Sequence, residues 1–308
     1  MDPFDPIVYY RDENLTEVEY PEKPIPPHLD IPADLLDEPT WTLEEWTRRG
    51  FPSNYDTSRF SPRLNAVAIR EMWVAVEKVF PVSRLGKSGL QLLYDVARSG
   101  LNSRLSSYVP TTHPNFCLEP RLHKPALVVI HDWLCENFLL GPFSAPPFPD
   151  GKVNGLLLIP KNLDNVRIVT DLSSPAPNSF NDCISDDFKK KFPLSMSSFS
   201  DVHRAISVAG SGALFCKHDL KDAYKYCKVH PSQVPAQQFS YAGLYFYDAA
   251  LIFGDKSAVH QFSFMHLSMV LSLVLPYSSL LPELCLLVID DQATFCPRDR
   301  AQLLWQFC

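Results

Sequence analysis

The segment LCLLVIDDQATFC, residues 284–296, places two adjacent carboxylates at the end of an apolar run. It predicts a tight β-hairpin with Asp290 and Asp291 at its tip. Two neighbouring acids beside a buried strand resist joint ionisation, and a bound divalent cation would remove that cost. For this pair alone a solvated turn is the simpler interpretation, because Asp is a common turn residue.

A second apolar run favours the metal site over the turn. ALFCKHDL, residues 213–220, predicts a strand that ends at Asp219, which lies 71 residues before Asp290. Two such strands side by side would bring Asp219, Asp290 and Asp291 together. Phosphoryl transfer by two metals needs this arrangement, because one ion activates the attacking oxygen and the other steadies the triphosphate and the leaving oxygen. We therefore expect two Mg²⁺ ions here, with Mn²⁺ as an alternative.

Four segments, in this order along the chain, resemble the motifs of reverse transcriptases. Residues 141–185, which contain DLSSP and NSFND, resemble the fingers segment of DIRS-type retrotransposons with tyrosine recombinases. HDLKDAYKYCKVHP (218–231) resembles the first catalytic motif, and YFYDAALIFGDKSAVHQF (245–262) resembles the motif that follows it. VIDD (288–291) is similar to the aromatic-x-Asp-Asp motif. The resemblance runs from about residue 120 to the last residue.

This resemblance implies an RNA-directed DNA polymerase. Such an enzyme extends a primer 3′-end on an RNA or DNA template and consumes deoxynucleoside triphosphates. The implied fold is α+β, with the fingers and palm of a right-hand polymerase, an antiparallel palm sheet flanked by helices and no thumb. The thumb, RNase H and recombinase regions of a longer polyprotein would be partners that this chain lacks.

The resemblance also implies roles for individual residues. The metal ligands would be Asp219, Asp290, Asp291 and the backbone carbonyl of Leu220. Asp222, Ala223 and Tyr224 would surround the sugar and triphosphate of the incoming nucleotide. Tyr224 would be the steric gate that excludes a ribose 2′-hydroxyl; without the motif, a core aromatic is the simpler interpretation.

The remaining implied contacts to the nucleotide come from two other segments. Arg167 would grip the triphosphate, a task that suits the bidentate guanidinium, and Lys161 would assist it. Phe253 and Gly254 would support the nascent base pair. The sequence departs from the family pattern at four positions, and Asp255 would place an extra acid near the template; the others are Ile252, Val259 and Val288.

Charge and proline content divide the chain. Residues 1–60 contain nine prolines and carry 14 acidic and 5 basic side chains, whereas residues 61–308 carry 21 acidic and 23 basic ones. We expect residues 1–60 to be mostly disordered or docked without regular structure, and dispensable for the core fold. A capping box at Thr42 and Glu45 predicts one short helix there, over residues 42–49.

Helical periodicity then predicts a helical region over residues 61–140, and the fingers and palm follow at 141–308. The helices expected in the first region cover residues 65–80, 90–101 and 124–138. Apolar runs separated by a polar turn predict a hairpin of residues 155–160 and 166–172, followed by a strand over 244–251. Further helices are expected over residues 200–209, 260–275 and 300–307.

Several classes of protein are disfavoured. The first residues do not form a signal peptide, and Pro276 and Pro282 interrupt the most apolar stretch, so we expect an intracellular protein of the cytoplasm or nucleus without a membrane span.

The cysteines form no CxxC pair. His113 with Cys117, and His131 with Cys135, have the spacing of zinc ligands on a helix, but helical packing explains such pairs equally well.

Two other functions remain open. A catalytically silent derivative would bind only nucleic acid or a protein partner, and the acidic charge and the motif departures favour it. A two-metal nuclease would use the three aspartates but has no role for Arg167 and Tyr224.

Overall fold

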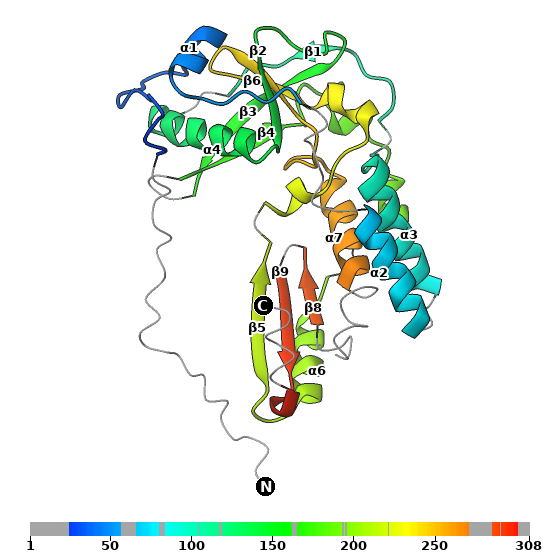
Figure 1. Cartoon of the computed structure of the whole chain (residues 1–308). Helices are drawn as coiled ribbons and strands as arrows, with labels where there is room; N and C mark the ends of the chain where they lie inside the picture. Colours follow the sequence, from blue (N-terminus) through cyan, green and yellow to red (C-terminus); the bar gives the residue numbers. More distant parts are fainter. Residues whose placement is uncertain are drawn as a thin grey trace.

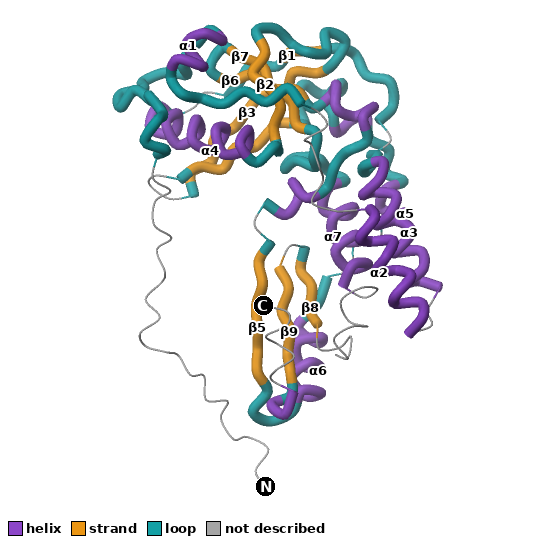
Figure 2. The backbone as a smooth tube through the Cα atoms, in the orientation of Figure 1, coloured by secondary structure: helices purple, strands orange, loops and turns teal. Residues whose placement is uncertain are grey.

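The computed structural model combines helices and sheets in a mixed α+β arrangement (Figures 1 and 2). It describes residues 25–56, 66–79, 84–103, 105–116, 119–161, 165–192, 194, 196–220, 222–270, 285–289 and 291–300. Figure 1 shows two separate sheets, one in the upper part of the molecule and one in the lower part, with helices α2, α3 and α7 alongside.

The upper sheet has six strands in the order β1-β3-β6-β7-β2, with β4 paired to β3. Strand β3 runs parallel to β1 and β6, and the other pairs are antiparallel. The strands are β1 (Thr111–Thr112), β2 (Leu139–Phe143), β3 (Lys152–Pro160), β4 (Val166–Asp171), β6 (Gln238–Tyr241) and β7 (Leu244–Asp248). Helix α4 (His123–Cys135) packs against the sheet and buries Leu127 and Ile130 in a core shared with Phe239 and Phe246.

The predicted hairpin of residues 155–160 and 166–172 is confirmed. Strands β3 and β4 pair antiparallel from Gly155 opposite Asp171 to Pro160 opposite Val166. The register places Arg167 opposite Ile159, near the turn of the hairpin. Along β4, buried and more exposed residues alternate, as expected for a strand with one face on the core.

The lower sheet has three antiparallel strands in the order β5-β9-β8. They are β5 (Leu214–Asp219), β8 (Cys285–Val288) and β9 (Asp291–Cys296), which confirms the predicted strand at 213–220 and the hairpin at 284–296. Helix α6 (Phe199–Ala209) packs against β8 and β9 and buries Ala205 and Ala209 in a core with Leu286 and Phe295.

Three helices form the side of the molecule in Figure 1. They are α2 (Ala66–Val79), α3 (Arg84–Ser99) and α7 (Ala258–Met269), and α3 packs against both others. Helix α3 begins six residues earlier than its periodicity predicts. The helix expected over residues 260–275 is described to Met269, and residues 271–275 and 301–307 lie outside the described residues. No helix among those described is both long and apolar enough to cross a bilayer.

Short helical segments connect these elements. They are α5 (Phe188–Lys191) and the 3-10 helices η1 (Pro120–Leu122), η2 (Asn181–Cys183), η3 (Ala223–Tyr226), η4 (Pro231–Ala236) and η7 (Arg298–Arg300). Of these, η3 follows β5 in the chain.

Residues 25–56 are docked on the upper sheet with little regular structure, which was one of the two alternatives expected for residues 1–60, but they contribute to its core, contrary to the expectation that they are dispensable. The short helix forms as predicted, as α1 (Leu43–Arg48), and Thr42 and Glu45 make the reciprocal bonds of a capping box. Trp46 on this helix is completely buried and packs on Phe246 of β7, with Trp41 and Phe51 beside it. A few large aromatic side chains therefore outweigh the acidic, proline-rich composition. The core that contains them crosses both expected domain boundaries, near residues 60 and 140.

Candidate active site

The ends of β5 and β9 bring two of the predicted metal ligands opposite each other. Asp219 is the ladder partner of Asp291, and Asp291 is also the partner of Val288 across the β8–β9 hairpin. Directly opposed residues of an antiparallel pair carry their Cβ atoms on one sheet face, about 4.5–5.5 Å apart. The structure describes the backbone of Asp219 but not its side chain, and Asp290 lies outside the described residues.

The hairpin tip between β8 and β9 contains a strained residue. Ile289 has a φ of 57°, a left-handed conformation that a β-branched residue rarely adopts. Such a conformation costs roughly 1–3 kcal/mol and persists only where surrounding contacts enforce it. One such contact comes from α7, where buried His266 donates from Nδ1 to the Ile289 carbonyl at 2.9 Å. The tip is therefore anchored from outside the sheet.

Asp291 already has a cationic partner. Nζ of Lys217, on β5, lies 3.0 Å from Oδ1 of Asp291, and the side chains are 59% and 44% exposed. An ion pair this exposed contributes little to stability, about 0–1 kcal/mol, so other ligands can replace it at small cost. The carboxylate of Asp291 therefore remains accessible from solvent.

The side chains that the structure describes contain no group of three or more potential metal ligands. The expected set of three carboxylates cannot appear among them, because Asp290 and the side chain of Asp219 are not described. His131 and Cys135 do contact each other on α4, with Nε2 and Sγ 3.7 Å apart, but they form only a pair. Cys117, the partner expected for His113, lies outside the described residues.

Leu220, predicted to bind metal through its carbonyl, and the residues predicted to surround the sugar and triphosphate follow β5 in the chain. Leu220 is partly buried, and Asp222 is exposed with a left-handed φ of 54°. The Asp222 carbonyl accepts a hydrogen bond from the backbone N–H of Lys225 at 2.8 Å, which starts η3. Ala223 and Tyr224 are buried in the core beside α3 and α7.

Three predicted residues from distant segments form a row. The ring of Tyr224 lies 4.9 Å from that of Phe253, and the guanidinium carbon of Arg167 lies 5.4 Å from the Phe253 ring centre. Phe253 is 46% exposed, whereas Tyr224 is 7% exposed and also packs on Phe262. The burial of Tyr224 agrees with the role of a core aromatic residue. Its ring also contacts Phe253, which is exposed, so Tyr224 lies directly beneath the molecular surface.

Gly254 holds this row close to strand β4. Its φ is 102°, and a Cβ atom there would lie 2.6 Å from the carbonyl oxygen of Thr170, so only glycine fits. The Gly254 carbonyl accepts a hydrogen bond from Asn181 at 2.8 Å. Lys161 lies exposed in the β3–β4 turn, and no described hydrogen bond or ion pair joins it to the row.

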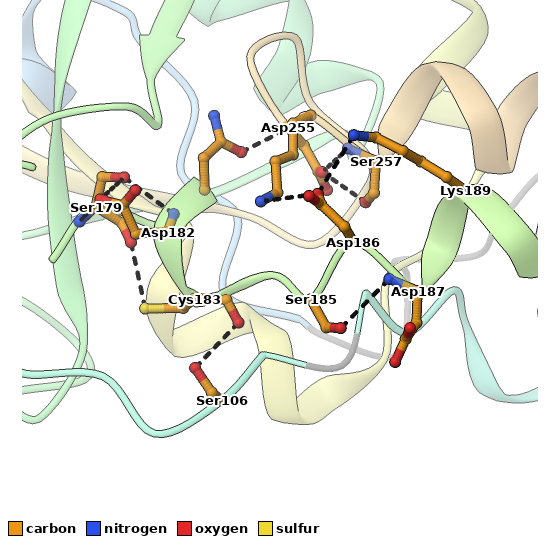
Figure 3. A network of polar contacts seen from close by, with 12 residues as sticks. Ser106, Ser179, Asp182, Cys183, Ser185, Asp186, Asp187, Lys189, Asp255 and Ser257 are labelled. Carbon is orange, nitrogen blue, oxygen red and sulfur yellow. Dashed lines mark hydrogen bonds and ion pairs between the residues drawn. The ribbon is translucent and has the colours of Figure 1, made fainter. Parts of the chain in front are cut away.

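Asp255 does not place an extra acid near a template. Its side chain is buried and accepts hydrogen bonds from the N–H and hydroxyl of Ser257, at 2.7 and 2.6 Å (Figure 3). The Ser103 hydroxyl donates a third at 3.3 Å. Burial raises the pKa of the Asp255 carboxyl, and these bonds oppose the rise. An acid at this position is therefore part of the core, because the turn before α7 directs its side chain inward.

Sequence reasoning missed a buried ion pair next to Tyr224. Nζ of Lys225, in η3, contacts Oδ1 of Asp248 at the end of β7, and the two side chains are 9% and 2% exposed. Nothing local predicts this pair, because its partners lie 23 residues apart and meet only when η3 reaches the upper sheet.

Comparisons with known proteins give a weak structural likeness. No protein-family model and no curated protein matches the chain. Among solved structures, the chain resembles prototype foamy virus protease–reverse transcriptase, as a selenomethionine-labelled mutant (TM-score 0.49, 15% identity) and in native form (0.48, 14%). It also resembles the foamy viral enzyme in complex with an RNA/DNA hybrid (0.49, 11%).

These likenesses cover 78%, 83% and 78% of the chain and 31% of each foamy virus chain. The chain thus spans about a third of the length of the proteins that it matches. At these identities and TM-scores the likeness assigns neither a family nor an activity.

Proposed function

We propose that the chain performs template-directed DNA synthesis by two-metal nucleotidyl transfer, adding deoxynucleotides to a primer 3′-end. The observation that carries this proposal is the β5–β9 register, with Asp219 opposite Asp291 where both strands meet the hairpin tip. The lower sheet would be the palm and the upper sheet the fingers. The assignment to DIRS-type retrotransposons, and to a longer polyprotein, rests on the sequence motifs alone.

The donor atoms near the strand ends suit hard divalent cations. Carboxylates at Asp219, Asp290 and Asp291, with the carbonyl of Leu220, are the oxygen ligands that Mg²⁺ prefers, and Mn²⁺ accepts the same set. Bound there, the two ions would activate the primer 3′-oxygen and neutralise charge on the triphosphate. Lys217 now pairs with Asp291, so a metal ion would have to displace this exposed ammonium from the site.

The row of Arg167, Phe253 and Tyr224 would receive the incoming nucleotide. The guanidinium of Arg167 can pair with phosphate oxygens while it stays over the Phe253 ring. Phe253 exposes an aromatic surface suited to a base pair, and Tyr224 beneath it would limit the space at the sugar 2′-position. Lys161, Asp222 and Ala223 would complete the triphosphate and sugar contacts.

Primer extension tests the proposal. The chain is incubated with Mg²⁺, the four deoxynucleotides and a labelled primer on RNA or DNA. We expect extension by the parent chain and none by Asp219→Asn or Asp291→Asn, because each loses a ligand charge. Asp34→Asn, a change of an exposed acid outside the site, should extend as the parent does. Extension that persists in Asp219→Asn would contradict the proposal.

The Lys217–Asp291 ion pair favours a second candidate, a catalytically silent derivative that binds nucleic acid. In that case Lys217 would replace the metal as the permanent partner of Asp291. Electrophoretic mobility of a primer–template duplex separates the candidates, because the silent protein would retard the duplex and incorporate no nucleotide with either Mg²⁺ or Mn²⁺.

A further inference from the structure

The residue that follows Tyr224 is a buried lysine, Lys225, whose ammonium contacts both a carboxylate and an aromatic ring. Lys225 contacts the carboxylate of Asp248, and its ammonium also lies 4.3 Å from the ring centre of Trp133 on α4. A buried ammonium is costly unless it is paired, and here one carboxylate and one aromatic face surround it. Burial raises the pKa of Asp248, and the neighbouring ammonium opposes that rise.

Asp248 is itself held in a fixed position. It ends β7, where it pairs with Leu139 of β2. Its backbone N–H donates to the Gln237 carbonyl at 3.2 Å, and its carbonyl accepts from the Gln237 side chain, also at 3.2 Å. The acceptor for Lys225 is therefore held by the hydrogen bonds of the upper sheet.

Backbone hydrogen bonds also join the two chain segments that follow Lys225 and Asp248. Leu251 donates to the Cys227 carbonyl at 2.8 Å, and Val229 donates to the Ala249 carbonyl at 3.0 Å. The last of these bonds is made by Leu251, which precedes Phe253 by two residues, and the Phe253 ring contacts Tyr224. The chain around Tyr224 therefore contacts the segment of residues 248–253 at two points. Lys225 contacts Asp248, and the Tyr224 ring contacts the Phe253 ring.

We propose that Lys225 and Asp248 are positioning residues that fix the Tyr224 segment, residues 222–227, against the upper sheet. Through this segment they set the space at the nucleotide sugar, a consequence that rests on the proposed function. Apolar side chains of similar volume would fill this place at lower cost in free energy, whereas an ion pair requires one particular geometry. The sequence order makes the coupling direct, since Lys225 adjoins Tyr224.

The test compares Lys225→Met, which keeps the volume and removes the charge, with Lys225→Arg, which keeps the charge. Lys189→Met, at an exposed lysine of α5, is the matched control. Hydrogen exchange of the backbone amides needs no turnover, so it decides the positioning even if the chain does not polymerise. We expect Lys225→Met to exchange about tenfold faster in residues 222–227, with β3 and β4 unchanged, because a local contact is lost.

The second measurement is the discrimination between deoxy- and ribonucleotides. We expect Lys225→Met to lower the ratio of the two kcat/KM values by about tenfold, and Lys225→Arg to restore most of it. Unchanged exchange in residues 222–227 would overturn the positioning claim, and so would an equal rise in β3 and β4, which would mark a general stabilising role. Faster exchange with unchanged discrimination, in an active parent, would overturn the link to the sugar.

Discussion

Replacing Trp46 by alanine should destabilise the whole fold, although this residue lies in an acidic, proline-rich segment. The indole is completely buried, and its ring centre lies 4.4 Å from that of Phe51 and 5.5 Å from that of Phe246. Its Nε1 donates to the Pro52 carbonyl at 2.9 Å. Truncating a buried Trp to Ala costs about 3–5 kcal/mol, and the lost hydrogen bond favours the upper end of that range.

Thermal unfolding followed by circular dichroism measures this effect. For a chain of this size about 1 kcal/mol corresponds to roughly 2 °C, so Tm should fall by about 6–10 °C. Leu36→Ala is the control in the same segment, because Leu36 is 73% exposed and its loss should change Tm by about 1 °C or less. If the Tm of Trp46→Ala equals the Tm of Leu36→Ala, the packing of residues 25–56 described above is refuted.

Two further predictions concern the site, and a third concerns the buried Asp255. Tyr224→Ala should keep polymerisation and relax sugar choice, measured by single-nucleotide incorporation; discrimination equal to the parent's would make Tyr224 only a core aromatic. Arg167→Lys should raise KM for deoxynucleotides about tenfold or more, because an ammonium loses both the bidentate contact and the flat contact with Phe253, and an unchanged KM would contradict that role. Burial raises the pKa of Asp255, so the folded state binds this proton more tightly than the unfolded state does. The stability of the parent relative to Asp255→Asn should therefore fall as pH rises above about 4, the ordinary pKa of an Asp carboxyl, and denaturant midpoints that keep a constant difference would contradict this.

Local patterns predicted the elements that carry the proposed chemistry. The apolar runs that end at Asp219 and before Asp290 coincide with β5 and with the first strand of the β8–β9 hairpin, although Leu214 and Phe215 of β5 are exposed. The hairpin of β3 and β4 follows from two apolar runs and a polar turn in the same way. The strands of each of these two hairpins lie close together in the chain, so short-range reasoning suffices for them.

Contacts between distant segments could not be predicted from these patterns. The six-stranded sheet joins β2 to β7, which lie about a hundred residues apart, and neither strand signals its partner. The burial of Trp46 was not predicted, because the composition of residues 1–60 is dominated by acids and prolines. One buried aromatic ring contributes more to packing than its share of that composition indicates. Asp255 and Lys225 were misjudged or missed because the burial of a charged residue depends on a partner that only the fold supplies.

Iron-directed cleavage tests most directly whether the ends of β5 and β9 form one metal site. Fe²⁺ bound in place of Mg²⁺ generates hydroxyl radicals with ascorbate and peroxide, and these cut the backbone close to the ion. Ligand oxygens lie about 2.0–2.6 Å from a bound divalent cation, so the cuts should mark both strand ends. The account predicts fragments ending near residues 219–220 and near residues 289–291, both suppressed by excess Mg²⁺ and both absent from Asp219→Asn. Cleavage at only one strand end, or cleavage that persists at residues 289–291 in Asp219→Asn, would contradict a shared site.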